Sequence, residues 1–212
     1  GVIQVEDFDE LLDATLAFSH APLPLGKGTA IITNSGGFSV LETDLCVKAG
    51  LEVPQFAKET LAELRRIVPL AGTSINNPLD AWPIYQNTLG TTGTLTDAIK
   101  VVSNDKDIHS MVLDFGGLGY LRRVFGDTFE DRLKEFIRII IQACRYARDE
   151  MSKTVMICIS LDVYLEDEKD RRAHLVAKKA FESERFPVYP SLGASIKALS
   201  NLYRYKAQCR TP

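Results

Sequence analysis

The sequence has few residues of the kind that bind metal ions or form disulfides. Its three histidines are isolated from one another, and its four cysteines lie far apart with no C-x-x-C pair. A structural zinc site needs about four such ligands in close pairs, so we expect no metal site. Three of the cysteines lie among apolar neighbours, and we expect the thiols to be reduced and mostly buried. The cysteines are Cys46, Cys144, Cys158 and Cys209.

Long apolar runs and an excess of charge of one sign are also missing. The longest apolar runs, such as residues 156–159, are much shorter than the roughly 20 residues of a membrane-spanning helix, and nothing resembles a signal peptide. Lysine and arginine number 25 against 28 aspartate and glutamate, a net charge of -3. This balance gives no overall field to attract nucleic acid or anionic lipid. We therefore expect a cytoplasmic protein that binds neither nucleic acid nor membrane.

The length and composition are those of a folded domain. The chain has 212 residues, of which 45% are hydrophobic and 25% charged, enough for a substantial buried core. It begins at Gly1 without an initiator methionine, which suggests a fragment of a longer protein.

Short apolar runs alternate with amphipathic segments along the chain. The apolar runs predict strands, and residues 1–5 also look strand-like. The predicted strands are 29–33, 51–53, 108–114, 154–159 and 187–189. Apolar residues at helical spacing predict the helices, of which the one near 125–147 has the strongest period. The predicted helices are 7–22, 38–49, 60–67, 94–102, 125–147, 166–181 and a last one from residue 192.

Alternating strands and helices of this kind predict an α/β fold, a doubly wound parallel sheet with helices on both faces. Such sheets bind ligands at the carboxyl ends of their strands. Two glycine-rich turns follow predicted strands, at Asn34–Gly37 and at Phe115–Gly117. A third segment, residues 69–82, is rich in Gly, Asn and Pro and is predicted to be a loop. Site residues are therefore expected in the two turns, including Gly116 and Gly117.

The turn from Thr33 to Phe38 is suited to an anion. It joins a strand to a helix, so unpaired N–H groups of the first helical turn face the end of the strand, and the helix dipole adds partial positive charge there. Gly36 and Gly37 have no side chains, so a phosphoryl group can approach the backbone. The spacing is neither that of a P-loop nor G-x-G-x-x-G. An ordinary tight turn with Asn34 or Ser35 as helix N-cap remains the alternative.

Several runs of the sequence together resemble one family. They are residues 30–44 (AIITNSGGFSVLETD), 49–51 (AGL), 77–80 (NPLD) and 186–190 (FPVYP), with an opening segment at 1–13. This set resembles the NDP-forming acyl-CoA synthetases of the succinyl-CoA synthetase superfamily, over nearly the whole chain.

The resemblance implies a flavodoxin-like ligase domain within a multidomain enzyme. Such enzymes interconvert acyl-CoA, phosphate and NDP with acid, CoA and NTP through a phosphohistidine. In the family this histidine lies in a neighbouring domain, upstream of this chain, and helix N-termini from two related domains flank it. The match places Asn34, Ser35, Gly36 and Gly37 at the anion-binding helix start. It also places Asn77, Pro78 and Asp80 in the N-P-x-D loop of the same pocket.

The resemblance also implies how the chain is divided and what it works with. Residues 1–25 form an arm leaving the preceding domain, 26–205 the ligase domain, and 206–212 a tail. No cofactor is expected in this fragment, whereas the full enzyme uses CoA, ATP or ADP, and Mg. Its partners are CoA-binding and ATP-grasp domains or subunits, in a homo- or hetero-oligomer, and the fragment alone is expected to be inactive.

Two other functions remain open from the residues. One is a non-catalytic flavodoxin-like module for binding or assembly. The other is a carrier of flavin or another phosphate ligand, which usually needs a Ser/Thr-rich phosphate loop and stacking aromatics. The aromatics available near strand ends are Phe38, Trp82, Phe115 and Tyr120.

Overall fold

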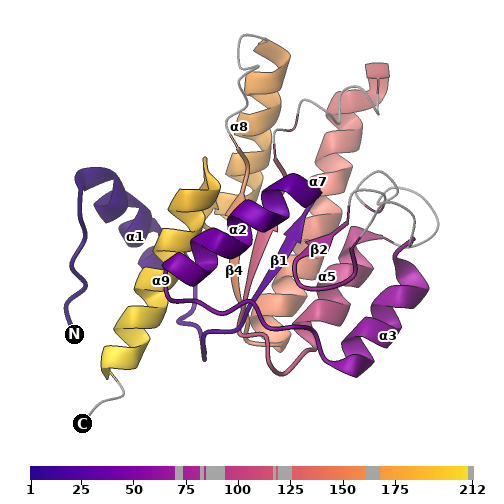
Figure 1. The fold of residues 1–212 in the computed structure, drawn as a ribbon. Coiled ribbons are helices and arrows are strands. Elements are labelled where there is room, and N and C mark those ends of the chain that lie inside the picture. The colour runs from indigo at the N-terminus through magenta and orange to yellow at the C-terminus, as the bar shows by residue number, and fades with distance from the viewer. Residues whose placement is uncertain are drawn as a thin grey trace.

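Figure 1 presents a computed structural model that describes residues 1–69, 74–81, 84, 94–116, 118, 126–160 and 168–209. Within these residues five parallel strands form one sheet in the order β2-β1-β3-β4-β5. This is the flavodoxin-like order of a doubly wound sheet, so the predicted fold class is confirmed. The strands are β1 (Thr29–Thr33), β2 (Leu79–Asp80), β3 (Ser110–Asp114), β4 (Thr154–Cys158) and β5 (Val188–Tyr189).

Helices cover both faces of the sheet (Figure 1). One face carries α1 (Phe8–His20), α2 (Gly36–Lys48) and α9 (Leu192–Cys209). The other carries α3 (Lys58–Ile67), α5 (Leu95–Ser103), α7 (Phe129–Arg145) and α8 (Glu168–Ser183). A short 3-10 helix, η1 (Gly126–Thr128), precedes α7, and a π-helical turn, η2 (Tyr146–Glu150), follows it. No helix in the described residues is long and apolar enough to cross a membrane.

The alternation of side chains along the central strands divides the core between the two faces. Ile31, Val112 and Met156 pack toward α1, α2 and α9. Their sequence neighbours, such as Ile32, point to the larger core beneath the other four helices. Every residue of β1, β3 and β4 is buried, as expected for parallel strands covered on both sides.

The edge next to β1 differs from the prediction. Residues 51–53 do not form a strand. Their only strand-like pairing in the described structure is an isolated bridge between Glu52 and Gly28. The edge strand is β2, which lies inside the segment predicted to be a loop and pairs with Ile32 and Thr33. Two paired residues are too few to produce a periodic signal. Residues 1–5 are also not a strand.

The predicted helices are present, with ends shifted by a few residues. The strongly periodic segment forms α7 but passes into the π-helical η2 at Tyr146, and residue 125 lies outside the described residues. Cys46, Cys144 and Cys158 are buried free thiols, whereas Cys209 is exposed. These observations agree with the predicted thiol state.

Helix α1 packs against α9, which in turn packs against α2. Ala17 of α1 is fully buried in the shared core. The hydroxyl of Tyr189, in β5, donates to the Asp13 carbonyl at 3.0 Å, and Phe18 meets Tyr205 edge to face. The arm predicted for residues 1–25 therefore contributes a helix to the domain core, while the boundaries at 25 and 205 remain predictions.

Candidate functional site

The predicted anion turn lies at the point where the order of the sheet changes direction. After β1 the chain passes to β2 on one side, and β3 pairs with the other side of β1. Crevices for ligands form outside the carboxyl ends of such strands. The turn Asn34–Gly37 leaves β1 there and leads into α2.

Ser35 is the N-cap of α2. Its backbone is extended, with φ -149° and ψ 118°, and its hydroxyl accepts a hydrogen bond from the Phe38 N–H at 3.5 Å. The N–H groups of Gly36 and Gly37 find no acceptor among the described residues. The two structures that the sequence left as alternatives are both present: a βα turn capped by Ser35, and a helix start whose first N–H groups have no acceptor in the described residues.

Asn34 joins the two glycine-rich turns. Its side-chain amide donates to the carbonyl of Phe115 at 3.0 Å. A β-carbon on Gly116, where φ is +56°, would lie 3.3 Å from Asn34 Oδ1, so this position needs glycine for both conformation and space. The Gly116 N–H in turn donates to Asp114 Oδ1 at 2.9 Å. Gly117, the other predicted residue, lies outside the described residues.

The N-P-x-D loop places its residues in different roles. The side chain of Asn77 is buried, and its oxygen accepts from the Ile31 N–H at 3.0 Å. Its amide nitrogen donates to the carbonyls of Thr29 and Pro54 at 2.8 and 2.9 Å. These bonds pair backbone groups of β1 that β2 does not reach. The Asn77 amide is therefore used by the backbone and does not face the anion turn. Pro78 follows through a cis peptide bond.

Asp80, at the end of β2, reaches the anion turn itself. Its Oδ2 lies 3.0 Å from where a β-carbon on Gly36 would stand. A carboxylate can only accept hydrogen bonds, so Asp80 shapes the first turn of α2 but opposes an approaching anion by its charge. The structure thus brings Asn34–Gly37, Asp80 and Gly116 to one edge of the sheet. Asn77 lies away from this edge, where its side chain binds the backbone of β1 and of Pro54.

Sequence reasoning missed a buried acidic pair beneath this edge. Glu42 of α2 and Asp114 of β3 are both fully buried. Burial, and then the charge of Asp114, raises the pKa of Glu42 to about 9, an effect that the nearby Thr33 hydroxyl partly offsets. Burial also raises the pKa of Asp114, against hydrogen bonds from Gly116 and Thr33. The only available signal was the position of Glu42 one turn before Cys46, on the buried face of α2.

The described residues offer no group of three or more His, Cys, Asp or Glu side chains arranged to hold a metal ion. What the edge offers is backbone N–H groups at a helix start, with the Asp80 carboxylate against the first turn and the buried acids Glu42 and Asp114 beneath it. Such an arrangement can hold an anion if enough of the neighbouring carboxyls carry protons.

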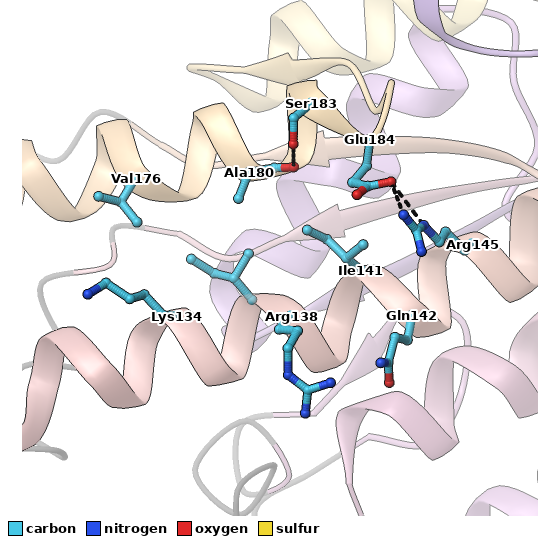
Figure 2. Close-up of a pocket in the computed structure, with 10 residues that line it drawn as sticks. Lys134, Arg138, Ile141, Gln142, Arg145, Val176, Ala180, Ser183 and Glu184 are labelled. Carbon is cyan, nitrogen blue, oxygen red and sulfur yellow. Dashed lines mark hydrogen bonds and ion pairs between the residues drawn. The ribbon is translucent and has the colours of Figure 1, made fainter.

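A groove lies elsewhere, between α7 and α8 (Figure 2). Its volume is about 300 Å³. Arg145 of α7 and Glu184, just after α8, form an ion pair across one end. Arg138 is paired with Glu135 of its own helix. Because α7 and α8 cover the face of the sheet opposite α2, this groove is not part of the predicted site.

Comparison with known proteins supports the resemblance. An ADP-forming acetate–CoA ligase II of Archaeoglobus fulgidus is 27% identical over 205 residues, which cover 97% of this chain and 27% of the relative. An ADP-forming acetate–CoA ligase of Methanocaldococcus jannaschii is 40% identical over 80 residues, 38% of this chain and 11% of that protein. The chain therefore spans well under half the length of these relatives.

Solved structures share the fold. A protein of Pyrococcus horikoshii OT3 matches 99% of this chain with 42% of its own, at a TM-score of 0.76 and 24% identity. A dinucleotide-forming acetyl-coenzyme A synthetase 1 of Ca. Korarchaeum cryptofilum matches 97% of this chain with 39% of its own, at a TM-score of 0.71 and 18% identity. The ligase-CoA domain family matches residues 29–198, from β1 into α9. Because this match includes all five described strands and the turn into α2, the chain belongs to the ligase-CoA domain family.

Proposed function

We propose that this chain is the ligase domain of a multidomain NDP-forming acyl-CoA synthetase, in which the start of α2 stabilises a phosphohistidine carried by a neighbouring domain. The full enzyme interconverts acyl-CoA, phosphate and NDP with acid, CoA and NTP. The observation that carries the proposal is the pair of N–H groups at Gly36 and Gly37, which have no acceptor in the described part of the chain and lie at the switch point of a ligase-CoA fold.

Two hydrogen bonds hold the turn in place. The Ser35 cap fixes the first turn of α2, and Asn34 ties the turn to the Phe115 carbonyl. Donors fixed by the fold need no reorganisation when a charged phosphoryl group arrives, which is what makes such donors effective. The helix dipole adds to the attraction. A β-carbon on Gly37 would meet nothing closer than Ser35 Oγ at 3.8 Å, so this side of the turn is open.

The partners of this site are other parts of the same enzyme. Four large apolar side chains of α2 are exposed beside and beyond the turn, and exposed apolar surface can mark a contact site. They are Phe38, Val40, Leu41 and Val47. We assign this surface to contact with the CoA-binding or ATP-grasp domains or subunits. Two related proteins of Pyrococcus furiosus are alpha subunits of ADP-forming acetate–CoA ligases, which supports an enzyme of several parts.

CoA, the nucleotide and any Mg belong to those other parts in this proposal. A structure of the Ca. Korarchaeum cryptofilum synthetase is a complex with phosphate and ADP, which supports phosphate and nucleotide as ligands of the whole enzyme. This chain supplies backbone donors, helix dipole and a shaped edge. It holds and orients the phosphoryl group, while the acyl chemistry takes place on its partners.

A glycine pair gives the test. Gly37 and Gly193 each occupy the second position of a helix, α2 and α9, and neither has a positive φ or a close neighbour. Valine at either position is expected to cost only a few tenths of a kcal/mol in stability. In the full-length enzyme, Gly37→Val should lower phosphohistidine formation from NTP at least about tenfold, because the branched side chain keeps the phosphoryl group away from the N–H donors. Gly193→Val should not lower it.

Both variants are also melted, so that a folding defect is separated from a site defect. If Gly37→Val melts and phosphorylates like the parent, α2 does not serve a phosphoryl group. If the parent enzyme itself forms no phosphohistidine, the alternative of a non-catalytic binding module takes precedence.

A further inference from the structure

Glu42 is a buried acid that the proposed site does not yet use. It lies in α2 and has no solvent exposure. Neither of its carboxyl oxygens has a hydrogen-bond partner within the described residues. An ionised carboxylate without partners in the protein interior costs several kcal/mol. Glu42 is therefore protonated at neutral pH, in agreement with its pKa of about 9.

The side chain of Glu42 belongs to the same unit as the anion turn. The charge that acts on the Glu42 carboxyl is that of Asp114, whose two oxygens accept from the Thr33 hydroxyl at 3.2 Å and the Gly116 N–H at 2.9 Å. Thr33 is the last residue of β1, directly before the turn, and Gly116 packs against Asn34 of the turn. A change of charge on Glu42 is thus felt through Asp114 and Thr33 at the start of α2.

The surroundings of Glu42 contain few other ionisable groups. Cys46 of its own helix has its pKa raised to about 12 by burial and by Glu42. Cys158 of β4 has its pKa raised by burial and by Asp114. Helix α9 contributes apolar side chains to the core around Cys46, and its Lys197 is paired with Glu6 and with Glu10 of α1. From β2, Asp80 meets the first turn of α2 rather than Glu42. Asp114 is therefore the group whose charge most affects the ionisation of Glu42.

We propose that Glu42 and Asp114 form a buried acid pair that stores one proton and couples it to the binding of a phosphoryl group at the start of α2. This inference rests on the proposed function. With the proton present, the buried pair beneath the turn carries one negative charge fewer, and a dianion can approach the Gly36 and Gly37 donors. When the proton leaves, a further negative charge is added beneath the site.

The coupling acts in both directions. A bound dianion makes loss of the stored proton harder, so binding raises the affinity of the pair for its proton. By the same linkage, phosphoryl binding weakens as pH rises through the range in which Glu42 ionises. Inorganic phosphate remains a dianion between pH 8 and 10, so a loss of affinity there comes from the protein. We expect about a tenfold loss, within the usual range for coupling between two sites.

The experiment uses the 212-residue chain, inorganic phosphate and the substitution Glu42→Gln, which keeps the shape and cannot ionise. Asp44→Asn is the control, because Asp44 is an exposed acid of the same helix. Calorimetric titration at pH 8, 9 and 10, in two buffers of different ionisation enthalpy, gives both affinity and proton uptake. The parent and Asp44→Asn should lose affinity and take up a fraction of a proton at pH 9, and Glu42→Gln should do neither.

Unfolding without ligand tests the stored proton independently. Folded Glu42 stays protonated up to about pH 9, whereas an unfolded glutamate ionises near its usual value of 4.5. The stability that the proton maintains is therefore present below pH 4.5 and lost as pH rises to 9. The ratio of unfolding constants, parent over Glu42→Gln, should rise steadily over this range.

Each outcome has one meaning. A ratio of unfolding constants that does not change with pH overturns the stored proton, whatever phosphate does. A rising ratio with phosphate affinity equal at pH 8 and 10 overturns the coupling alone. A rising ratio with no phosphate binding at pH 8 also overturns the coupling alone, because phosphohistidine formation by the full-length Gly37→Val variant decides the proposed function.

Discussion

Asp80 Oδ2 lies 3.0 Å from the place where Gly36 would carry a β-carbon. The first turn of α2 and the end of β2 are thus in contact across the mouth of the predicted site. The neighbouring glycine has no such contact, because a β-carbon on Gly37 would be 3.8 Å from its nearest neighbour, Ser35 Oγ. A side chain at Gly36 would therefore press on Asp80, whereas a side chain at Gly37 has space.

This difference predicts the effect of alanine at each position. Gly37→Ala should leave stability unchanged or raise it by up to about 1 kcal/mol, because alanine restricts the unfolded chain. Gly36→Ala should be less stable than Gly37→Ala by about 1 kcal/mol, because its methyl group must displace the Asp80 carboxylate. Urea unfolding of both variants measures the difference. In an Asp80→Ala background the difference should disappear, and its persistence there would contradict the contact.

Asn77 carries a second prediction. Its side chain is 3% exposed and makes three hydrogen bonds to backbone groups of Ile31, Thr29 and Pro54. Asn77→Ala leaves these groups without partners in the interior, at about 1–3 kcal/mol for each buried group. We expect a loss of at least about 3 kcal/mol in the free energy of unfolding. The control is Asn104→Ala, which removes one exposed hydrogen bond from Tyr146 and should cost under about 0.5 kcal/mol.

The parts of the fold that were predicted are those with a local signal. The strands β1, β3 and β4 are runs of five buried residues, and a mostly apolar run of this length can be recognised from the sequence alone. The edge strand β2 was missed because its two residues follow an Asn-Pro turn and acquire strand geometry only by pairing with β1. The apolar residues at 51–53 predicted a strand, but Leu51 is buried in the core and the segment makes only one bridge in the described structure.

The site divides in the same way. Two glycines after a buried strand predict the turn at Gly36 and Gly37, since this pattern is local. The part played by Asn77 depends on Ile31, 46 residues earlier, and no local pattern contains that contact. Glu42 was missed because glutamate in a helix is almost always on the solvated face. Its burial follows from the way α2 lies on the sheet against β1 and α9.

The isolated chain provides a third prediction. In our proposal the phosphohistidine, the CoA site and the nucleotide site all lie in other parts of the enzyme. The 212-residue chain should therefore form no acyl-CoA from acid, CoA and either ATP or GTP, even when its melting curve shows that it is folded. Thioester formation followed by high-performance liquid chromatography is the measurement. Activity of the pure chain at a rate comparable to a complete synthetase would overturn the assignment of these steps to partner domains.

The packing of α1 provides the last prediction, in which pH is the variable. Glu10 of α1 is 5% exposed. Its carboxylate accepts from Asn201 of α9 at 2.9 Å and from the Glu6 N–H at 2.7 Å, and it lies 3.0 Å from Lys197 Nζ. Burial favours the neutral acid, but these donors together hold the pKa of Glu10 below its usual value of 4.5.

A carboxyl with a lowered pKa stabilises the fold above its unfolded pKa and ceases to do so as pH falls through the folded one. The parent should therefore lose this contribution below about pH 4.5. Glu10→Gln should cost about 1–3 kcal/mol at pH 7, because an amide group then faces donors in a buried place, and the deficit should shrink toward pH 3. Glu6→Gln is the matched control, since Glu6 also pairs with Lys197 but through a side chain that is 82% exposed, and exposed pairs contribute about 0–1 kcal/mol. Urea unfolding at pH 3, 5 and 7 separates the two. Equal losses for both variants, or a Glu10→Gln deficit that does not change with pH, would show that α1 is not held to α9 through this carboxylate.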